Sequence, residues 1–170
     1  MRKIHLLTFC ILYLSLPVFA QGWRGIKPIE STCKDVRSKF GSKVCSEGSV
    51  NKIFRTETVT LIFAGSCSES DENDSYNVPP GTLINIFIIP HNTKRLFISD
   101  LHVPKSKFQK KIAGDHLGVF EYVSVELGMS FNASKNGQIL DMWYFPAAKY
   151  NYLRCSSRHK EATNLRTKKY

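Results

Sequence analysis

Four cysteines follow the N-terminal apolar segment of this chain, and their spacing limits the chemistry that they can do. They are Cys33, Cys45, Cys67 and Cys155. The chain lacks the close CxxC or CxxH pair that zinc sites use. A catalytic thiol would have to stay reduced, which an oxidising compartment disfavours. An even number of cysteines in an exported chain therefore predicts two structural disulfides, for which three connectivities exist.

The spacing favours Cys45–Cys67 as the first disulfide. The residues between these cysteines have the pattern of a β-hairpin with its turn near Glu57-Thr58, which would bring both cysteines to the open end of the hairpin. A Cys33–Cys45 bond would have to bridge most of a helix that rises about 1.5 Å per residue, too far for a disulfide. Cys155 would then pair with Cys33 or remain free.

The other residues capable of chemistry do not form a recognisable site. Asp115-His116 are neighbours in a predicted turn, where adjacent side chains usually point apart. Residues 68–75 begin like a calcium loop but lack its glycine and its distal glutamate. No phosphate-binding glycine loop and no GxSxG motif is present. The histidines after the apolar segment are not spaced as metal pairs: His91, His102, His116 and His159. We therefore predict no catalytic residue, no metal site and no cofactor.

Basic residues and aromatic residues are the remaining candidates for binding. The formal net charge is +10. Outside the cytoplasm, such charge suits an anionic membrane surface or polymer rather than nucleic acid, although a solvated basic surface is the simpler interpretation. The aromatic run 143–152 could stack on sugars or bases, but such side chains more often fill a β-sheet core. The predicted anionic-surface contacts are Lys105, Lys107, Lys110, Lys111, Arg158, Lys160, Arg166, Lys168 and Lys169.

The start of the chain predicts export. Arg2 and Lys3 precede the apolar run Leu6–Ala20, which ends in the small-x-small pattern of Val18-Phe19-Ala20. This is typical of a signal peptide cleaved after Ala20, and the run is too short to span a bilayer comfortably. Cys10 follows a bulky residue inside the run, so a lipid-modified cysteine is disfavoured. No later segment is long and apolar enough to cross a membrane. We expect a protein of the periplasm or the extracellular space.

The positions of these residues depend on a predicted helix and a predicted sheet. Thr82–Ile89 is rich in β-branched and aromatic residues and is bounded by prolines, which predicts a central strand covered on both faces. Thr32 and Asp35 form a capping box for a short helix that ends at Gly41. Residues 51–63 predict a hairpin, and 91–118 a long loop with room for one helical turn.

The second half of the chain predicts a three-stranded meander over 119–145, with a turn at Asn136-Gly137. The expected fold is α+β: one short N-terminal helix packed on an antiparallel sheet of about six strands, stabilised by disulfides. Residues 21–155 would form one domain, and 156–170 a basic flexible tail.

Two resemblances accompany this pattern. Thr32–Gly41 is similar to the "T-x-x-E-V…L-G" helix of outer-membrane assembly lipoproteins of the SmpA/OmlA (BamE-like) type. Over a longer range, Gly22–Thr32, Tyr76–Thr82, Pro146–Lys149 and Leu153–Cys155 resemble a group of exported bacterial proteins of unknown function. The resemblance implies an exported bacterial domain and no particular activity.

These observations favour a non-catalytic binding or structural module of the bacterial envelope, with a protein or an anionic envelope component as its partner. An inhibitor of a secreted enzyme is the alternative, by analogy with other helix-and-sheet scaffolds, and an enzyme of unrecognised type comes third. Asn73 and Asn132 begin glycosylation sequons, which matter only in a eukaryotic source.

Overall fold

The computed structural model describes residues 22–41, 48–65, 67, 75–91, 95–113 and 118–155. The signal segment, Cys45, the acidic loop, His116 and the basic tail therefore lie outside the described residues. The elements are α1 (Cys33–Phe40), β1 (Gly48–Ile53), β2 (Glu57–Phe63), β3 (Leu83–Pro90), the 3-10 helices η1 (Ile98–Leu101) and η2 (Lys105–Lys107), β4 (Gln109–Ile112), β5 (Val119–Ser124), β6 (Met129–Ser134), β7 (Ile139–Tyr144) and the 3-10 helix η3 (Ala148–Leu153).

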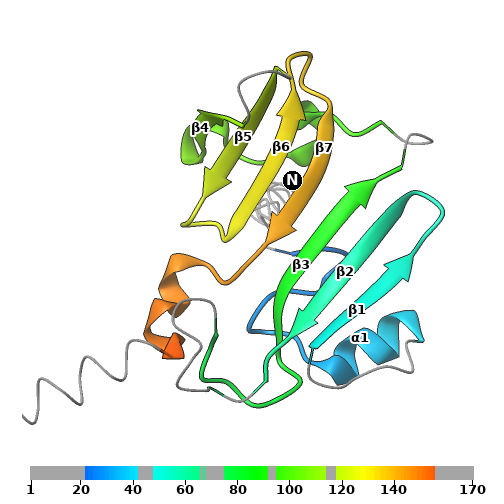
Figure 1. Ribbon diagram of the computed structural model, residues 1–170, viewed down its shortest axis with the longest axis vertical. Helices are drawn as coiled ribbons and strands as arrows, with labels where there is room; N and C mark the ends of the chain where they lie inside the picture. Colours follow the sequence, from blue (N-terminus) through cyan, green and yellow to red (C-terminus); the bar gives the residue numbers. More distant parts are fainter. Residues whose placement is uncertain are drawn as a thin grey trace, which may run out of the picture.

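The seven described strands form one antiparallel sheet in the order β1-β2-β3-β7-β6-β5-β4 (Figure 1). The chain makes a meander from β1 to β3, and the described residues 95–108 then lead to β4 at the far edge. The chain returns as a second meander from β4 to β7. Strands β3 and β7 meet in the middle through three residue pairs. The prediction of an antiparallel sheet is confirmed, and β4 is the strand that the sequence interpretation missed.

Strand β3 lies in the middle of the sheet, as predicted, but it is covered on one face only along its second half. Ile86 and Ile88 are fully buried on one face. On the other face Phe87 is half-buried and Ile89 is 44% exposed, so the prediction of two covered faces is wrong there. The larger cluster of buried apolar residues lies on the face of Ile86. A second, smaller cluster of buried residues covers the opposite face, but only near Ile84.

Helix α1 forms as predicted and packs against the β1–β2 hairpin. The carboxylate of Asp35 accepts hydrogen bonds from the backbone N–H and the hydroxyl of Thr32, at 2.7 and 2.8 Å. Gly41 ends the helix with φ of 62°, a left-handed conformation that favours glycine. Val36 is buried, and the ring of Phe40 contacts the rings of Trp23 and Phe54 at 5.0 and 5.7 Å between centroids.

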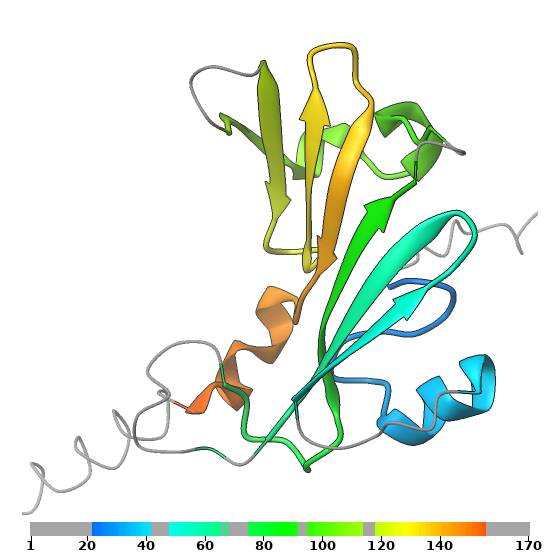
Figure 2. The same cartoon turned by 45° about the vertical axis from the view of Figure 1, so that its right-hand side comes forward.

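Two segments cover the core face of the sheet, which we define as the face that carries Ile86 and Ile88. Residues 22–31 and α1 cover the side of β1 to β3. The connection 96–108, which includes η1 and η2, covers the side of β5 to β7 through Leu96, Ile98, Leu101 and Phe108. Figure 2 shows how far the sheet twists between β1 to β3 and β5 to β7.

Both hairpin turns that the sequence indicated are present. The turn between β1 and β2 lies at residues 54–56, slightly before the predicted Glu57-Thr58, and Ile53 pairs with Thr58. Gly137 has φ of 83° in the turn between β6 and β7, the positive value that its Asn-Gly turn requires.

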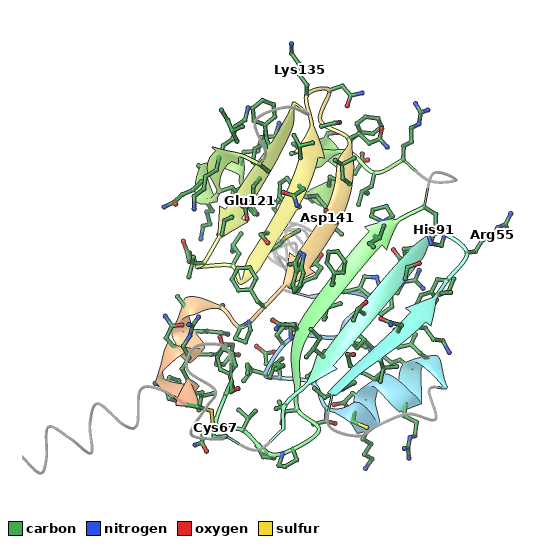
Figure 3. All side chains as sticks on the ribbon, in the orientation of Figure 1. Arg55, Cys67, His91, Glu121, Lys135 and Asp141 are labelled. Atoms are coloured by element: carbon green, nitrogen blue, oxygen red, sulfur yellow. A yellow bond between two sulfur atoms is a disulfide. The ribbon has the colours of Figure 1, made fainter. Side chains whose placement is uncertain are left out.

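The observed disulfide joins Cys67 to Cys155, so the predicted Cys45–Cys67 pairing is wrong. Two backbone hydrogen bonds hold the end of η3 against residues 75–77, from Asn77 N to Leu153 O and from Cys155 N to Ser75 O, at 2.7 and 3.0 Å. This return of the chain brings Cys155 to Cys67, which lies beside η3 in Figure 3. The same bond excludes the suggested Cys33–Cys155 pair, although Cys33 is itself disulfide-bonded.

Candidate functional site

The face of the sheet opposite the core face is open over most of the seven strands, and we call it the open face. Figure 1 looks onto it, and no described helix crosses β2, β3, β5, β6 or β7 in that view. Pairing between strands aligns one row of side chains across the whole sheet: Asn51, Thr60, Phe87, Trp143, Ser130, Val123 and Gln109.

Two aromatic residues occupy the centre of this row. The rings of Phe87 and Trp143 contact each other at 4.6 Å between centroids, with 43° between their planes. Trp143 remains 38% exposed, whereas its neighbours Met142 and Tyr144 are buried on the core face. Ile89, also on the open face, extends the apolar area. The expectation that the aromatics of 143–152 fill the core therefore holds for Tyr144 and fails for Trp143 and Tyr152, which is 71% exposed.

Polar side chains surround the aromatic centre and bond to one another. The amide nitrogen of Asn132 donates to both carboxylate oxygens of Asp141, at 3.0 and 3.2 Å. The hydroxyl of Thr60 donates to the amide oxygen of Asn51, at 2.7 Å. Figure 3 shows Glu121 and Asp141 on the side of the sheet that faces the viewer, where Glu121 is the neighbour of Asn132 in the strand pairing.

Four of the predicted anionic-surface contacts lie along the β4 edge of the sheet, which we call the basic edge. Lys105 and Lys107 belong to η2, and Lys110 and Lys111 to β4. Lys107 forms an ion pair with Glu126, and the ammonium of Lys110 lies 3.8 Å from the ring centroid of Phe120. Lys111 is opposite Glu121 and belongs to the open face.

The other five predicted contacts lie outside the described residues: Arg158, Lys160, Arg166, Lys168 and Lys169. Of the four described lysines of the basic edge, the strand pairing places only Lys111 on the open face, and the contribution of the tail is untested.

The two histidines that the structure describes, His91 and His102, have structural partners, whereas Asp115, His116 and His159 lie outside the described residues. A ring nitrogen of His91 lies 2.8 Å from the hydroxyl of Thr58, and one of His102 lies 2.8 Å from the backbone oxygen of Asp100. Within the described ranges, no three His, Cys, Asp or Glu side chains come together as metal ligands. No helix among the described residues is long and apolar enough to span a membrane.

The sequence interpretation did not single out Phe87 as a surface residue, and for Trp143 it favoured the core over the stacking surface that it also considered. The signal that locates Trp143 is alternation, because Met142 and Tyr144 point to the core and the residue between them must point away. The chain matches no protein-family model, no curated protein and no solved structure. Any function has to be argued from the open face and from the rest of this structure.

Proposed function

We propose that this protein is an exported, non-catalytic binding module of the bacterial envelope that holds an anionic polymer on its open face. The observation that carries the proposal is the contact of half-buried Phe87 with exposed Trp143 at the centre of an uncovered sheet face. Contiguous exposed apolar patches that polar residues surround are typical of binding sites. The signal-peptide pattern that ends at Ala20 supports the export that this function requires.

The chemistry around the aromatic pair favours a charged sugar polymer over other anionic partners. An aromatic ring offers a flat apolar surface for the face of a sugar, and nearby amides, hydroxyls and carboxylates bond to sugar hydroxyls. Asn132 with Asp141 and Thr60 with Asn51 supply such groups on both sides of the rings. Lys111, the lysine of the basic edge that lies on the open face, then attracts the negative charges of the polymer.

Titration calorimetry with dextran sulfate, and with neutral dextran of the same length, tests this function. We expect dextran sulfate to bind, the affinity to fall as salt is added, and neutral dextran to bind more weakly or not at all. Trp143→Ala should weaken binding at least tenfold. Tyr152→Ala is the matched control, because Tyr152 is exposed but belongs to η3 and not to the open face.

Equal affinity of the wild type and Trp143→Ala for dextran sulfate would overturn the proposed site. Tight binding of neutral dextran would show that the charge of the basic edge does not select the partner. Failure of both polymers to bind, while an envelope protein protects Trp143, would replace the polymer with a protein partner.

A further inference from the structure

A second concave site lies on the core face of the sheet, where the two covering segments leave a gap. Trp23 and Arg24 border it from the first segment, and Leu96 borders it from the second. Thr56, Glu57 and Pro90 form one end, and Ile88 and Met142 form its floor. The cleft has a volume of about 250 Å³. This lies just below the usual range for small-molecule sites, roughly 300–1,000 Å³, and suits a compact ligand.

A partly buried carboxylate lies at the border of this cleft. The Oε1 atom of Glu57 accepts hydrogen bonds from the indole N–H of Trp23 at 3.2 Å and from the guanidinium of Arg24 at 2.7 Å. Both described bonds end on Oε1, so Oε2 keeps its full acceptor capacity. The side chain of Glu57 is 18% exposed, and Oε2 is not among the buried side-chain atoms of the described residues that lack a hydrogen-bond partner. Solvent therefore reaches Oε2, and a ligand donor would replace water there.

The cation beside Glu57 stacks on aromatic rings at the border of the cleft. The guanidinium carbon of Arg24 lies 5.1 Å from the ring centroid of Trp23 and 5.0 Å from that of Phe54. Its side chain is 46% exposed, so it is a rim group, whereas Glu57 is the more deeply placed charge. The buried hydroxyl of Tyr144 also experiences this charge, because Glu57 adds to the effect of burial in raising the pKa of Tyr144.

We propose that this cleft, which we call the Glu57 cleft, binds a small molecule with a protonated amine and a compact apolar body. The amine would donate to Oε2 of Glu57, and the apolar body would contact Ile88, Leu96 and Met142. A ligand carboxylate would face the negative charge of Glu57 at short range and is disfavoured. A neutral alcohol would keep the apolar contact but lose the charge-assisted hydrogen bond.

The two tryptophans of the chain allow this cleft to be tested separately from the open face. The chain has two tryptophans in all. Trp23 borders the Glu57 cleft and Trp143 lies on the open face, so Trp143→Phe leaves a single reporter in the cleft. If no ligand binds in the cleft, the proposed polymer site on the open face is not contradicted. If no polymer binds on the open face, the cleft is not contradicted.

The probes are cyclohexylmethylamine, cyclohexylmethanol and cyclohexanecarboxylate, which share a ring and differ in charge. In the Trp143→Phe protein we expect the amine to change Trp23 emission saturably, with at least tenfold higher affinity than the alcohol, and the carboxylate to have no effect. Glu57→Gln should reduce the affinity for the amine at least tenfold and leave that for the alcohol unchanged. The amide keeps an acceptor for Trp23, and a thermal melt checks that the variant is folded.

Two further variants make the outcome decisive. Glu126→Gln removes an exposed carboxylate of similar charge from another part of the surface and should not change the affinity for the amine. Leu96→Phe should narrow the cleft without adding a second tryptophan, and should weaken binding of both the amine and the alcohol. Equal affinities for amine and alcohol, an unaffected Glu57→Gln, or no saturable change up to about 10 mM amine, roughly the limit of a meaningful affinity, would overturn the proposal.

Discussion

At the scale of single residues, burial has its largest effect on a pKa at the hydroxyl of Tyr144, among the described groups. Burial raises the pKa of its hydroxyl from the ordinary 10.0 to about 12, and the negative charge of Glu57 adds to the effect. The folded protein therefore favours the neutral hydroxyl. Below pH 10 the stability is unaffected, and it is lost progressively as the pH rises from 10 through about 12.

We predict that Tyr144→Phe reduces this alkaline loss of stability. Each unit of pKa shift corresponds to about 1.4 kcal/mol, so the difference between wild type and variant should approach roughly 2–3 kcal/mol near pH 12. Urea unfolding at pH 9 and pH 12 measures it, with absorbance at 295 nm to follow tyrosine ionisation. Tyr152→Phe, at a position 71% exposed, is the control and should behave as the wild type. The same alkaline loss in Tyr144→Phe would contradict the assignment.

Strand β7 shows which features of a single residue can be predicted from the sequence and which cannot. The alternation of Met142, Trp143 and Tyr144 is readable in the sequence, and it places Trp143 opposite the core. The contact of Trp143 with Phe87 cannot be predicted from the sequence, because it depends on which strand lies beside β7. Glu57 and Trp23 are separated by more than 30 residues and could not be paired from sequence either.

At the scale of the elements, β3 is the strand on which both halves of the sheet depend. Ile86 is fully buried and pairs with Leu61 on β2 and with Tyr144 on β7. We predict that Ile86→Asp abolishes folding, because it places an unpaired charge in the core. Circular dichroism and a thermal melt check this.

Ile89→Asp is the matched control for Ile86→Asp. It makes the same chemical change on the same strand, but on the open face, where the side chain is 44% exposed. The variant should fold, with a stability loss of about 1 kcal/mol or less, as is usual for exposed positions. A cooperative melt of Ile86→Asp close to that of the wild type would show that the core face has been assigned incorrectly.

The sequence identifies the elements that have strong local patterns and misses those that do not. The capping box of α1, the apolar run of β3 and the Asn136-Gly137 turn are local signals, and all three are confirmed. Strand β4 consists of Gln109–Ile112, and all four residues are exposed at the sheet edge. An edge strand without buried positions has no alternation to detect, and lysines are common there because they block further pairing.

At the scale of the whole molecule, the Cys67–Cys155 disulfide closes a large loop. The two cysteines are 88 positions apart. A bond that closes a loop of this length is expected to contribute about 2–5 kcal/mol, mainly by restricting the unfolded chain. We predict a loss of that size in the Cys67→Ser/Cys155→Ser double variant, measured by urea unfolding. The double variant is preferable to a reductant, because Cys33 is also disulfide-bonded.

Peptide mapping without reduction is the companion measurement for the disulfide. A peptide that joins Cys67 to any cysteine other than Cys155, or a double variant as stable as the wild type, would contradict the structure. The pairing could not be predicted from the hairpin, because it depends on η3 returning the chain to residues 75–77. Such long-range closure has no local signature.

Shielding of Trp143 is the most direct test of the proposed function. In Trp23→Phe protein, Trp143 is the remaining tryptophan, and its exposure on the open face makes it accessible to acrylamide. A bound anionic polymer should shield it, so we predict that dextran sulfate lowers the acrylamide quenching constant at least twofold and that added salt reverses the effect. An unchanged quenching constant under conditions where calorimetry shows dextran sulfate bound would contradict the account, because the polymer would then occupy another surface.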